Sequence, residues 1–487
     1  ERMLVEFGRA NLLDKARQQP DKVRMVFDKA RTDGIAATIQ SVHAKLDKPL
    51  ALGYSNAGVV MAVGTGIADI EVGDRVVSNG PHAEYVCVPQ NLCARIPEGV
   101  SDEAAAFAVV GAIALQGVRL AQPNLGETVA VIGLGLIGLI TVQILRANGC
   151  RVLGVDPDSE RAALARRFGA TTCVPSAGED PLETASRLTT GVGLDAVLIT
   201  ASTSSDEPVH QAAQMCRKRG RIVLIGVTGL NLSRADFYEK ELTFQVSCSY
   251  GPGRYDPFYE DQGHDYPVGF VRWTEQRNFE AVLELLSTHS LDVEPLISRR
   301  ADIGDAPAAY DYLATGNPLG VVLRYPGPAP GTVVGAISRR VTLKSADQAH
   351  TQEPGISFIG AGNYASQVLM PALRKTGANL QVVVSASGVS GVHGGRKFGF
   401  RAAATDATQA LDDPATDAVV IATRHDSHAR YVIEALRHRK HVFVEKPLAI
   451  SREELASIRT AWQAAADAGF NAMIMTGFNR RFAPHVR

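Results

Sequence analysis

The chain has 487 residues, too many for a single hydrophobic core, and a length of this order predicts about three domains. Its 50 Lys and Arg residues balance 51 Asp and Glu residues, so no strong positive field is present to attract nucleic acid or an anionic membrane. With 45% hydrophobic and 21% charged residues, the composition is that of a folded globular protein rather than of a disordered chain.

The six cysteines are too widely spaced to form a C-x-x-C pair, so the sequence predicts no zinc ribbon, iron–sulfur cluster or thiol-exchange site. The first residues are charged and mixed, unlike a secretory leader, and the uncharged run 128–145 is interrupted by glycines, which argues against a membrane span. We therefore expect a cytoplasmic protein. Because the chain begins at Glu1 and stops within a recognisable pattern at Arg487, we also expect a fragment at both ends.

The part of the chain before residue 113 contains two segments with different sequence patterns. Residues 10–48 are rich in Ala, Lys, Arg and Asp and place Val23, Val26 and Phe27 at helical spacing, which predicts an inserted helical segment. This segment either covers a substrate cleft or a subunit contact, or it is a solvated helix with no special role. Residues 58–100 alternate β-branched residues with turn signals, which predicts a small antiparallel barrel.

Residues 128–156 form a dinucleotide-binding fingerprint: a short apolar strand, Gly133-x-Gly135-x-x-Gly138, an apolar helix and a second strand that ends at Asp156. Gly133 allows a tight turn, Gly135 lets the backbone approach a pyrophosphate, and Gly138 lets the helix pack closely on the sheet. The N–H groups at the helix N-terminus suit the phosphates. Asp156 can accept hydrogen bonds from the ribose hydroxyls and would repel a 2′-phosphate, which predicts NAD here.

Further apolar strands at 196–200 and 221–226 extend this unit into a doubly wound parallel sheet. From residue 1 to residue 325 the sequence resembles the medium-chain dehydrogenase/reductase superfamily, also called zinc-type alcohol dehydrogenases. This resemblance implies a GroES-like small β-barrel attached to the Rossmann domain. It is carried, in the family's order, by Gly58-Val59-Val60, Gly73-Asp74-Arg75-Val76, Ala83-Glu84-Tyr85, the nucleotide motif and Gly220-Arg221-Ile222-Val223.

The zinc ligands of that family are not matched. Zinc-dependent members carry Gly-His-Glu where this chain has Gly53-Tyr54-Ser55, the cysteine-rich lobe is absent, and no ligand type stands near Val110-Gly111. One remaining ligand could not rebuild a three-ligand site, so we expect no zinc and no other metal.

Hydride transfer without a metal needs another group to stabilise the developing oxyanion. Tyr54, Ser55 and His82 are positional candidates for this role, and Tyr250 and Arg254 are further ones. Each of these residues could equally serve only in packing or in capping a turn.

A Pro- and Gly-dense stretch at 326–331 marks a domain boundary, and weakly patterned sequence follows it to residue 354. A second fingerprint then begins, in which Gly360-x-Gly362-Asn363-x-Ala365 joins a strand to a helix. Alanine at the third position still allows close packing.

The acid expected after the second strand of this unit is replaced by Ser387, and Arg396 and Lys397 follow on the next predicted helix. A hydroxyl with nearby cations suits a 2′-phosphate, so NADP is favoured beside NAD at this site. The two cations could equally belong to an ordinary solvated helix face.

Residues 356–487 resemble the Gfo/Idh/MocA oxidoreductase family, whose members act largely on sugars, sugar nucleotides and polyols. The family's lysine faces the substrate and the nicotinamide, which implies a catalytic role for Lys446. The histidines at 425, 428, 438 and 441 lack carboxylate support, so we expect no metal among them. The resemblance is carried by Ala422-Thr423, His428, Glu445-Lys446-Pro447 and the run from Gly477 through Asn479 to Phe482.

The resemblance places Ala422, Thr423, Glu445 and Asn479 among the cofactor-binding residues of the second unit. The family's substrate domain, with its acid/base histidine, would follow Asn479, where this chain stops.

The predicted fold is α/β, with two Rossmann-type doubly wound parallel sheets, the first attached to the small barrel. The leading functional hypothesis is an NAD(P)-dependent oxidoreductase acting on the CH–OH or carbonyl group of a sugar-like substrate. A pathway of cell-surface polysaccharide synthesis is suggested by analogy only. The predicted organisation is a barrel (1–112), a first Rossmann domain (113–265), a segment returning to the barrel (266–325), a linker (326–354) and a second Rossmann domain (355–487).

Two other hypotheses remain open: a zinc-free reductase of activated C=C bonds or quinones, and a dinucleotide-binding regulator or scaffold without turnover. We expect a small-molecule substrate, no nucleic-acid or membrane partner, and a homo-oligomer.

Overall fold

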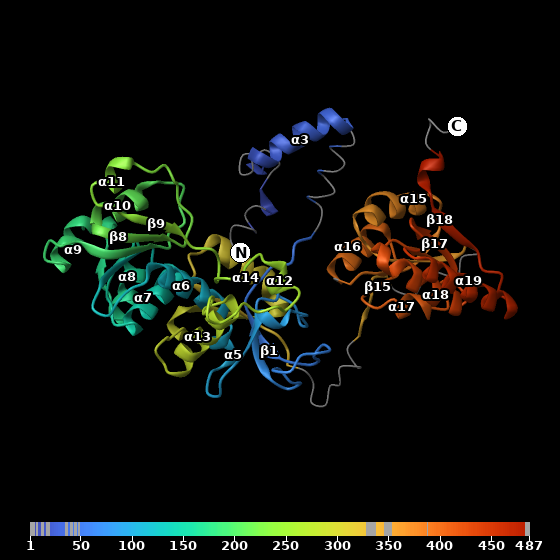
Figure 1. Cartoon of the computed structure of the whole chain (residues 1–487), viewed down its shortest axis with the longest axis horizontal. Helices are drawn as coiled ribbons and strands as arrows, with labels where there is room; N and C mark the ends of the chain where they lie inside the picture. The colour runs from blue at the N-terminus through green and yellow to red at the C-terminus, as the bar shows by residue number, and fades with distance from the viewer. Residues whose placement is uncertain are drawn as a thin grey trace. The chain divides into compact units, whose positions relative to one another are not determined.

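The computed structural model (Figure 1) describes residues 20–34, 49–327, 338–344, 353–386 and 388–482, with single positions scattered before residue 49. Contacts within the chain divide it into two compact units. The first contains residues 1–10 and 52–329, and the second contains residues 11–51 and 330–487. The division falls in the Pro- and Gly-rich stretch where we expect a linker.

The first unit is built on a six-stranded parallel sheet in the order β6-β5-β4-β7-β8-β9. The central strand β4 is buried along its whole length, because helices cover both faces of the sheet. Val129 and Val131 pack into one hydrophobic core, whereas Ala130 and Ile132 pack into the core on the other face. The predicted doubly wound sheet is thus confirmed. Its strands are β4 (Thr128–Ile132), β5 (Arg151–Val155), β6 (Thr171–Cys173), β7 (Leu194–Ile199), β8 (Cys216–Leu224) and β9 (Thr243–Val246).

The helices of this unit follow the alternation expected of βαβ units. They are α5 (Asp102–Ala105), α6 (Ala108–Ala121), α7 (Leu136–Ala147), α8 (Ser159–Arg167), α9 (Pro181–Leu188), α10 (Glu207–Met215), α11 (Arg234–Tyr238) and α12 (Pro257–Glu260). No helix in the described part of the chain combines the length and apolar character that crossing a bilayer requires. The apolar run that begins at residue 128 forms β4 and α7 instead.

A small antiparallel sheet precedes the Rossmann fold, where the sequence predicts a barrel. It contains β1 (Asn56–Val59), β2 (Arg75–Ser78) and β3 (Cys93–Arg95) in that order. The return segment packs against it, since α13 contacts both β3 and α6. This segment contains α13 (Glu275–Ser287), β10 (Ile297–Asp302), α14 (Ala306–Thr315) and β11 (Gly320–Arg324).

The second unit has a seven-stranded sheet in the order β12-β15-β14-β13-β16-β17-β18. All neighbours in it are parallel except β12 and β15. The strands are β12 (Arg340–Thr342), β13 (Gly355–Ile359), β14 (Asn379–Val384), β15 (Ala402–Ala404), β16 (Ala418–Ile421), β17 (His441–Glu445) and β18 (Ile474–Gly477). The helices are α3 (Pro20–Asp33, in the predicted helical insertion), α15 (Met370–Lys375), α16 (Val389–Phe398), α17 (Thr408–Leu411), α18 (His428–Arg437) and α19 (Arg452–Asp467).

Strand β12 lies within the stretch 326–354, where the sequence predicts a linker and gives no sign of a strand. It pairs antiparallel with β15 at the edge of the second sheet. Arg340 Nη2 lies 2.6 Å from Asp413 Oδ2, and the Asp413 side chain is almost fully buried. The strand is held by this buried carboxylate from a distant part of the chain, which its own short, polar sequence could not indicate.

Candidate functional site

The first glycine cradle lies at the carboxyl edge of the first sheet, immediately after β4. Gly133 has φ +94°, and a Cβ there would lie 2.7 Å from the backbone nitrogen of Ala201. A Cβ at Gly138 would lie 1.9 Å from the carbonyl oxygen of Gly133. Gly135 caps the N-terminus of α7. A side chain at Gly133 or Gly138 would therefore fill space that the backbone needs, and the glycines let the start of α7 approach a phosphate closely.

Asp156 lies beside this cradle, at the end of β5. Its Oδ2 accepts a hydrogen bond from the backbone nitrogen of Leu134 at 2.6 Å, and its Oδ1 accepts one from the nitrogen of Asp158 at 2.8 Å. These bonds fix the carboxylate against the glycine turn. Each carboxylate oxygen can still accept a second hydrogen bond, so the group fits the hydroxyls of a ribose.

A second polar group beside the cradle was not predicted. A Cβ placed on Gly135 would lie 4.0 Å from Arg161 Nη1, so this guanidinium on α8 reaches back over the glycine turn. Asn317, just before β11, accepts a hydrogen bond from Arg161 and donates one to Asp158 at 3.2 Å. Arg161 could have been suspected from its position after Asp156. Asn317, in contrast, gives no local signal.

The candidates in the small sheet lie together. Tyr54 precedes β1 and is partly exposed. A Cβ on Gly53 would lie 2.6 Å from Cγ of His82, so the residue before Tyr54 packs directly against that imidazole. His82 also faces Tyr310, with ring centroids 6.3 Å apart. Ser55 donates its hydroxyl to the carbonyl of Ala106 at 2.5 Å, a bond that ties two segments of the fold together and gives Ser55 a structural role.

Tyr250 and Arg254 belong to a separate, buried cluster. Asn79 Nδ2 donates to the Tyr250 hydroxyl at 3.1 Å. The Arg254 guanidinium lies 5.1 Å from the Tyr250 ring and pairs with Glu260 at 2.6 Å. Burial raises the pKa of the Tyr250 phenol, which keeps it protonated and able to donate a hydrogen bond. Asn79, which follows β2, is a polar partner that the sequence analysis missed.

The second glycine cradle lies after β13. Gly360 has φ +106°, and a Cβ there would lie 2.4 Å from the carbonyl oxygen of Ala422, whereas a Cβ on Gly362 would meet open space. Ala365 is buried where the following helical segment begins. Thr423 follows Ala422 at the end of β16, so its loop lies next to the cradle in the sheet. The turn can therefore approach a dinucleotide as the first one can.

Lys446 follows β17 at the same edge of this sheet, and its side chain is exposed. Its backbone nitrogen donates to Glu445 Oε2 at 3.3 Å. A Cβ on Gly477 would lie 2.7 Å from Glu445 Oε1, which places this carboxyl against β18. Asn479 Nδ2 donates to the hydroxyl of Tyr364 at 3.2 Å. Tyr364, the neighbour of Asn363 in the cradle, was not among the predicted residues.

The proposed cations for a 2′-phosphate lie elsewhere. Arg396 and Lys397 occupy the last turn of α16, and the carbonyl of Lys397 accepts a hydrogen bond from Arg374 at 2.9 Å. A helix of this length spans about 15 Å, which separates both residues from the carboxyl end of β14. The pairing of these cations with a hydroxyl at the cofactor site is therefore wrong. Ser387 itself lies outside the described residues.

Within the described ranges, no three His, Cys, Asp or Glu side chains gather closely enough to hold a metal ion. The resemblance to zinc-type alcohol dehydrogenases implies ligands at the positions of Tyr54 and Ser55, and a phenol and a hydroxyl already bound to a carbonyl do not fit the ligand chemistry of a catalytic zinc.

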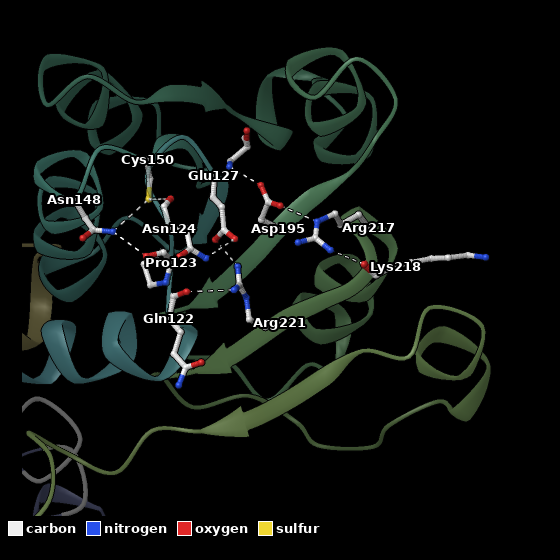
Figure 2. A network of polar contacts seen from close by, with 11 residues as sticks. Gln122, Pro123, Asn124, Glu127, Asn148, Cys150, Asp195, Arg217, Lys218 and Arg221 are labelled. Carbon is white, nitrogen blue, oxygen red and sulfur yellow. Dashed lines mark hydrogen bonds and ion pairs between the residues drawn. The ribbon is translucent and has the colours of Figure 1, made fainter. Parts of the chain in front are cut away.

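The amino ends of the strands carry a separate, structural network (Figure 2). Asp195 accepts a hydrogen bond from the backbone nitrogen of Thr128 at 2.8 Å and one from Arg217 at 2.7 Å. Arg221 pairs with Glu127. Because β4 runs from Thr128 toward Gly133, these groups lie at the end of the sheet opposite the glycine cradle.

Family models match three stretches of the chain. A model of the alcohol dehydrogenase GroES-like domain matches residues 30–98, and a model of zinc-binding dehydrogenases matches residues 137–261. The Gfo/Idh/MocA model, described as an oxidoreductase family with an NAD-binding Rossmann fold, matches residues 355–475.

Curated proteins resemble the chain as well. It is 30% identical over 269 residues to D-guloside 3-dehydrogenase of Escherichia coli, an alignment that covers 53% of this chain and 72% of that protein. It is 24% identical over 314 residues to sorbitol dehydrogenase of Halalkalibacterium halodurans, covering 58% and 85% of the two chains. Among solved structures, galactitol-1-phosphate dehydrogenase from Escherichia coli has 25% identity and a TM-score of 0.49, covering 56% of this chain and 84% of that one.

Proposed function

The chain belongs to the zinc-type alcohol dehydrogenase family and carries an oxidoreductase domain of the Gfo/Idh/MocA type, and from this premise we propose that it transfers hydride between a nicotinamide dinucleotide and the CH–OH or carbonyl carbon of a sugar, sugar nucleotide or polyol. It is an NAD(P)-dependent oxidoreductase. The observation that carries the proposal is the pair of glycine cradles, each at the carboxyl edge of its own doubly wound sheet.

In the first unit, we propose that Gly133, Gly135 and Gly138 receive the pyrophosphate and that Asp156 accepts the ribose hydroxyls. The carboxylate is fixed by two backbone N–H groups and would repel a third phosphate, which supports NAD. When it is bound, the nicotinamide ring of the cofactor donates or accepts the hydride.

Zinc has no part in our proposal for the first unit, because Tyr54 and Ser55 do not fit its ligand chemistry. We propose that Tyr54, which precedes β1, and His82, which follows β2, hold and move the proton of the substrate hydroxyl. The contact between Gly53 and the His82 ring supports this pairing.

In the second unit, we propose that the turn from Gly360 to Ala365, with Asn363 in it, receives NADP or NAD. Ala422, Thr423, Glu445 and Asn479 line the edge around it. The ammonium of Lys446 would hold the reacting oxygen of the substrate and stabilise the charge that develops there. Its place at the carboxyl edge of β17, beside the Glu445 carboxyl, supports this role.

The first test is a titration of the whole chain with NADH and with NADPH, followed by nicotinamide fluorescence. Two sites are expected, one of which prefers NADH and loses affinity at least tenfold in Asp156→Ala. Glu183→Gln removes an exposed carboxylate on α9 and is the matched control, in which both affinities stay unchanged. A single site, or an Asp156→Ala protein that binds NADH like the parent, contradicts the assignment of the first cradle.

A second test separates an enzyme from a dinucleotide sensor. Polyols and sugar nucleotides are offered with NAD or NADP, and Lys446→Ala is compared with Lys375→Ala, which removes an exposed ammonium at the end of α15. We expect hydride transfer at the second site to be lost only in Lys446→Ala. Equal rates in both variants exclude Lys446 from the reaction.

A further inference from the structure

His428 is a buried residue at the carboxyl edge of the second sheet, and the proposed function gives it no task. It is the first residue of α18 and has no exposed surface. Its Nδ1 lies 2.7 Å from the carbonyl oxygen of Pro447, and its Nε2 lies 3.2 Å from the carbonyl oxygen of Thr423. Carbonyl oxygens only accept and a neutral imidazole carries a single N–H, so the shorter contact assigns the proton to Nδ1 and the hydrogen bond to Pro447, while Nε2 packs against the Thr423 carbonyl without donating to it.

These two carbonyls belong to two different loops of the candidate site. Thr423 lies in the loop after β16, against the glycine cradle, and Pro447 directly follows Lys446 after β17. The strands are parallel neighbours with Ile421 opposite Val444, so the two loops leave the sheet side by side. Ser427, the residue before His428, adds a hydrogen bond from its hydroxyl to that of Thr423 at 2.8 Å. Together, the Nδ1–H of His428 and the hydroxyl of Ser427 thus join the loop that carries Lys446 to the loop that carries Thr423 at the start of α18.

The Lys446 loop is restrained further along by packing of Leu448 and Ala449 against a hydrophobic core and by a hydrogen bond from the backbone nitrogen of Ile450 to Glu454 Oε2 at 2.8 Å. The backbone nitrogen of Lys446 lies 3.3 Å from Glu445 Oε2, which is a long contact, and the side chain points into exposed surroundings. The bond from His428 to Pro447, the residue after Lys446, is shorter and part-buried, its donor ring has no exposed surface, and hydrogen bonds shielded in this way orient functional groups more strictly than exposed ones.

We propose that His428 is a positioning residue that fixes the loop carrying Lys446 relative to the loop carrying Thr423, and so sets where the ammonium stands against a bound nicotinamide. The inference rests on the proposed function of Lys446. It assigns His428 no contact with substrate or cofactor. We call the two hydrogen bonds from His428 to Pro447 and from Ser427 to Thr423 the clasp. Loss of the clasp should change cofactor and substrate interactions only through the position of Lys446.

The test compares His428→Ala with His428→Gln and with His425→Ala in the whole chain. Gln keeps an N–H donor for one carbonyl and should restore part of the clasp. His425 is exposed, and its ring lies 5.6 Å from that of His428, so its removal controls for the loss of a neighbouring imidazole. Two readouts do not need turnover: amide hydrogen exchange across residues 446–450, and the rate at which an amine-reactive ester labels Lys446 with and without NADH or NADPH.

In His428→Ala we expect exchange across residues 446–450 to rise at least tenfold and the cofactor's protection of Lys446 to fall by a similar factor. His425→Ala should match the parent, and His428→Gln should lie between. A double variant, His428→Ala with Lys446→Ala, should bind cofactor no more weakly than Lys446→Ala alone, because the two residues act through one group.

The proposal is overturned if exchange at residues 446–450 is unchanged in His428→Ala, or if exchange rises equally over the whole second unit, which would make His428 a general stabiliser. Additive losses in the double variant also overturn it. Failure of the proposed function gives a different result: neither dinucleotide protects Lys446 in the parent protein, while the exchange data still test the clasp.

Discussion

Replacing Glu275 with glutamine should stabilise the first unit at alkaline pH and leave it little changed in acid. Glu275 is the first residue of α13 and has no exposed surface. Among the residues that the structure describes, neither oxygen of its carboxyl group has a hydrogen-bond partner. Burial, with Glu260 nearby, raises the pKa of Glu275 from 4.5 to about 8, and Arg254 only partly opposes this shift. The folded protein therefore holds a neutral carboxylic acid at neutral pH.

The size and sign of the effect follow from proton linkage. A pKa that is raised in the folded state favours the protonated form there, so the full stability is present below pH 4.5 and is lost as the pH rises toward 8. The free energy of unfolding should fall by up to ~1.4 kcal/mol for each pH unit in this interval, and by at most ~5 kcal/mol in total. Glutamine has the same shape and does not ionise.

Unfolding should be followed locally, because a chain with two units need not unfold in one step. The chain has two tryptophans, and Trp273 lies two residues before Glu275, so its fluorescence in a Trp462→Phe background reports on the first unit. Urea unfolding of parent and Glu275→Gln proteins is measured at pH 5, 7 and 9. The advantage of the variant should grow steadily between pH 5 and 8 and then level off.

A constant offset between the two proteins is allowed, because an amide without partners has its own cost of about 1–3 kcal/mol. The decisive quantity is how the difference in the free energy of unfolding between Glu275→Gln and the parent changes with pH. Glu284→Gln removes an exposed carboxylate from the same helix, and its difference from the parent should not depend on pH. Parallel curves for parent and Glu275→Gln between pH 5 and 9 would refute a neutral, buried Glu275.

Three further results are expected. Gly138→Ala should abolish NADH binding at the first site, because its Cβ would lie 1.9 Å from the Gly133 carbonyl, whereas Gly58→Ala, where nothing lies within 4 Å, should bind normally in the same titration. Glu127→Gln removes the carboxylate that pairs with Arg221, which keeps its hydrogen bond to the Gln122 carbonyl, and should lower the free energy of unfolding by ~2–4 kcal/mol without changing NADH affinity, since the pair lies at the amino ends of the strands (Figure 2). Arg340→Ala should release β12 and increase hydrogen exchange at residues 340–342, with exchange in β16 unchanged.

The parts of the fold that sequence reasoning predicted are those encoded locally. Each glycine cradle is written in a short stretch where a strand, a turn and a helix follow one another, and the steric demand at Gly133 and Gly360 is met within that stretch and one neighbouring strand. Asp156 was predictable for the same reason, because βαβ geometry fixes its distance from the glycines.

The errors arose where position along a helix or a distant partner decided the outcome. Arg396 and Lys397 follow β14 in sequence, yet one helix length takes them away from its carboxyl end. Strand β12 looks like linker sequence, because its stabilising partner Asp413 lies 73 residues away. Composition can show neither relation.

The candidate sites also combine features encoded locally with contacts between distant residues. The polar bonds that complete them join residues far apart in the chain: Asn79 to Tyr250 across 171 positions, Arg161 to Asn317 across 156, and Asn479 to Tyr364 across 115. A motif can thus specify a glycine cradle locally, while the polar partners of the candidate site residues are brought in by the tertiary fold. Variants at these distant partners should therefore alter affinity and cofactor preference while leaving the glycine motifs intact, which a titration of each variant with NADH and with NADPH would check.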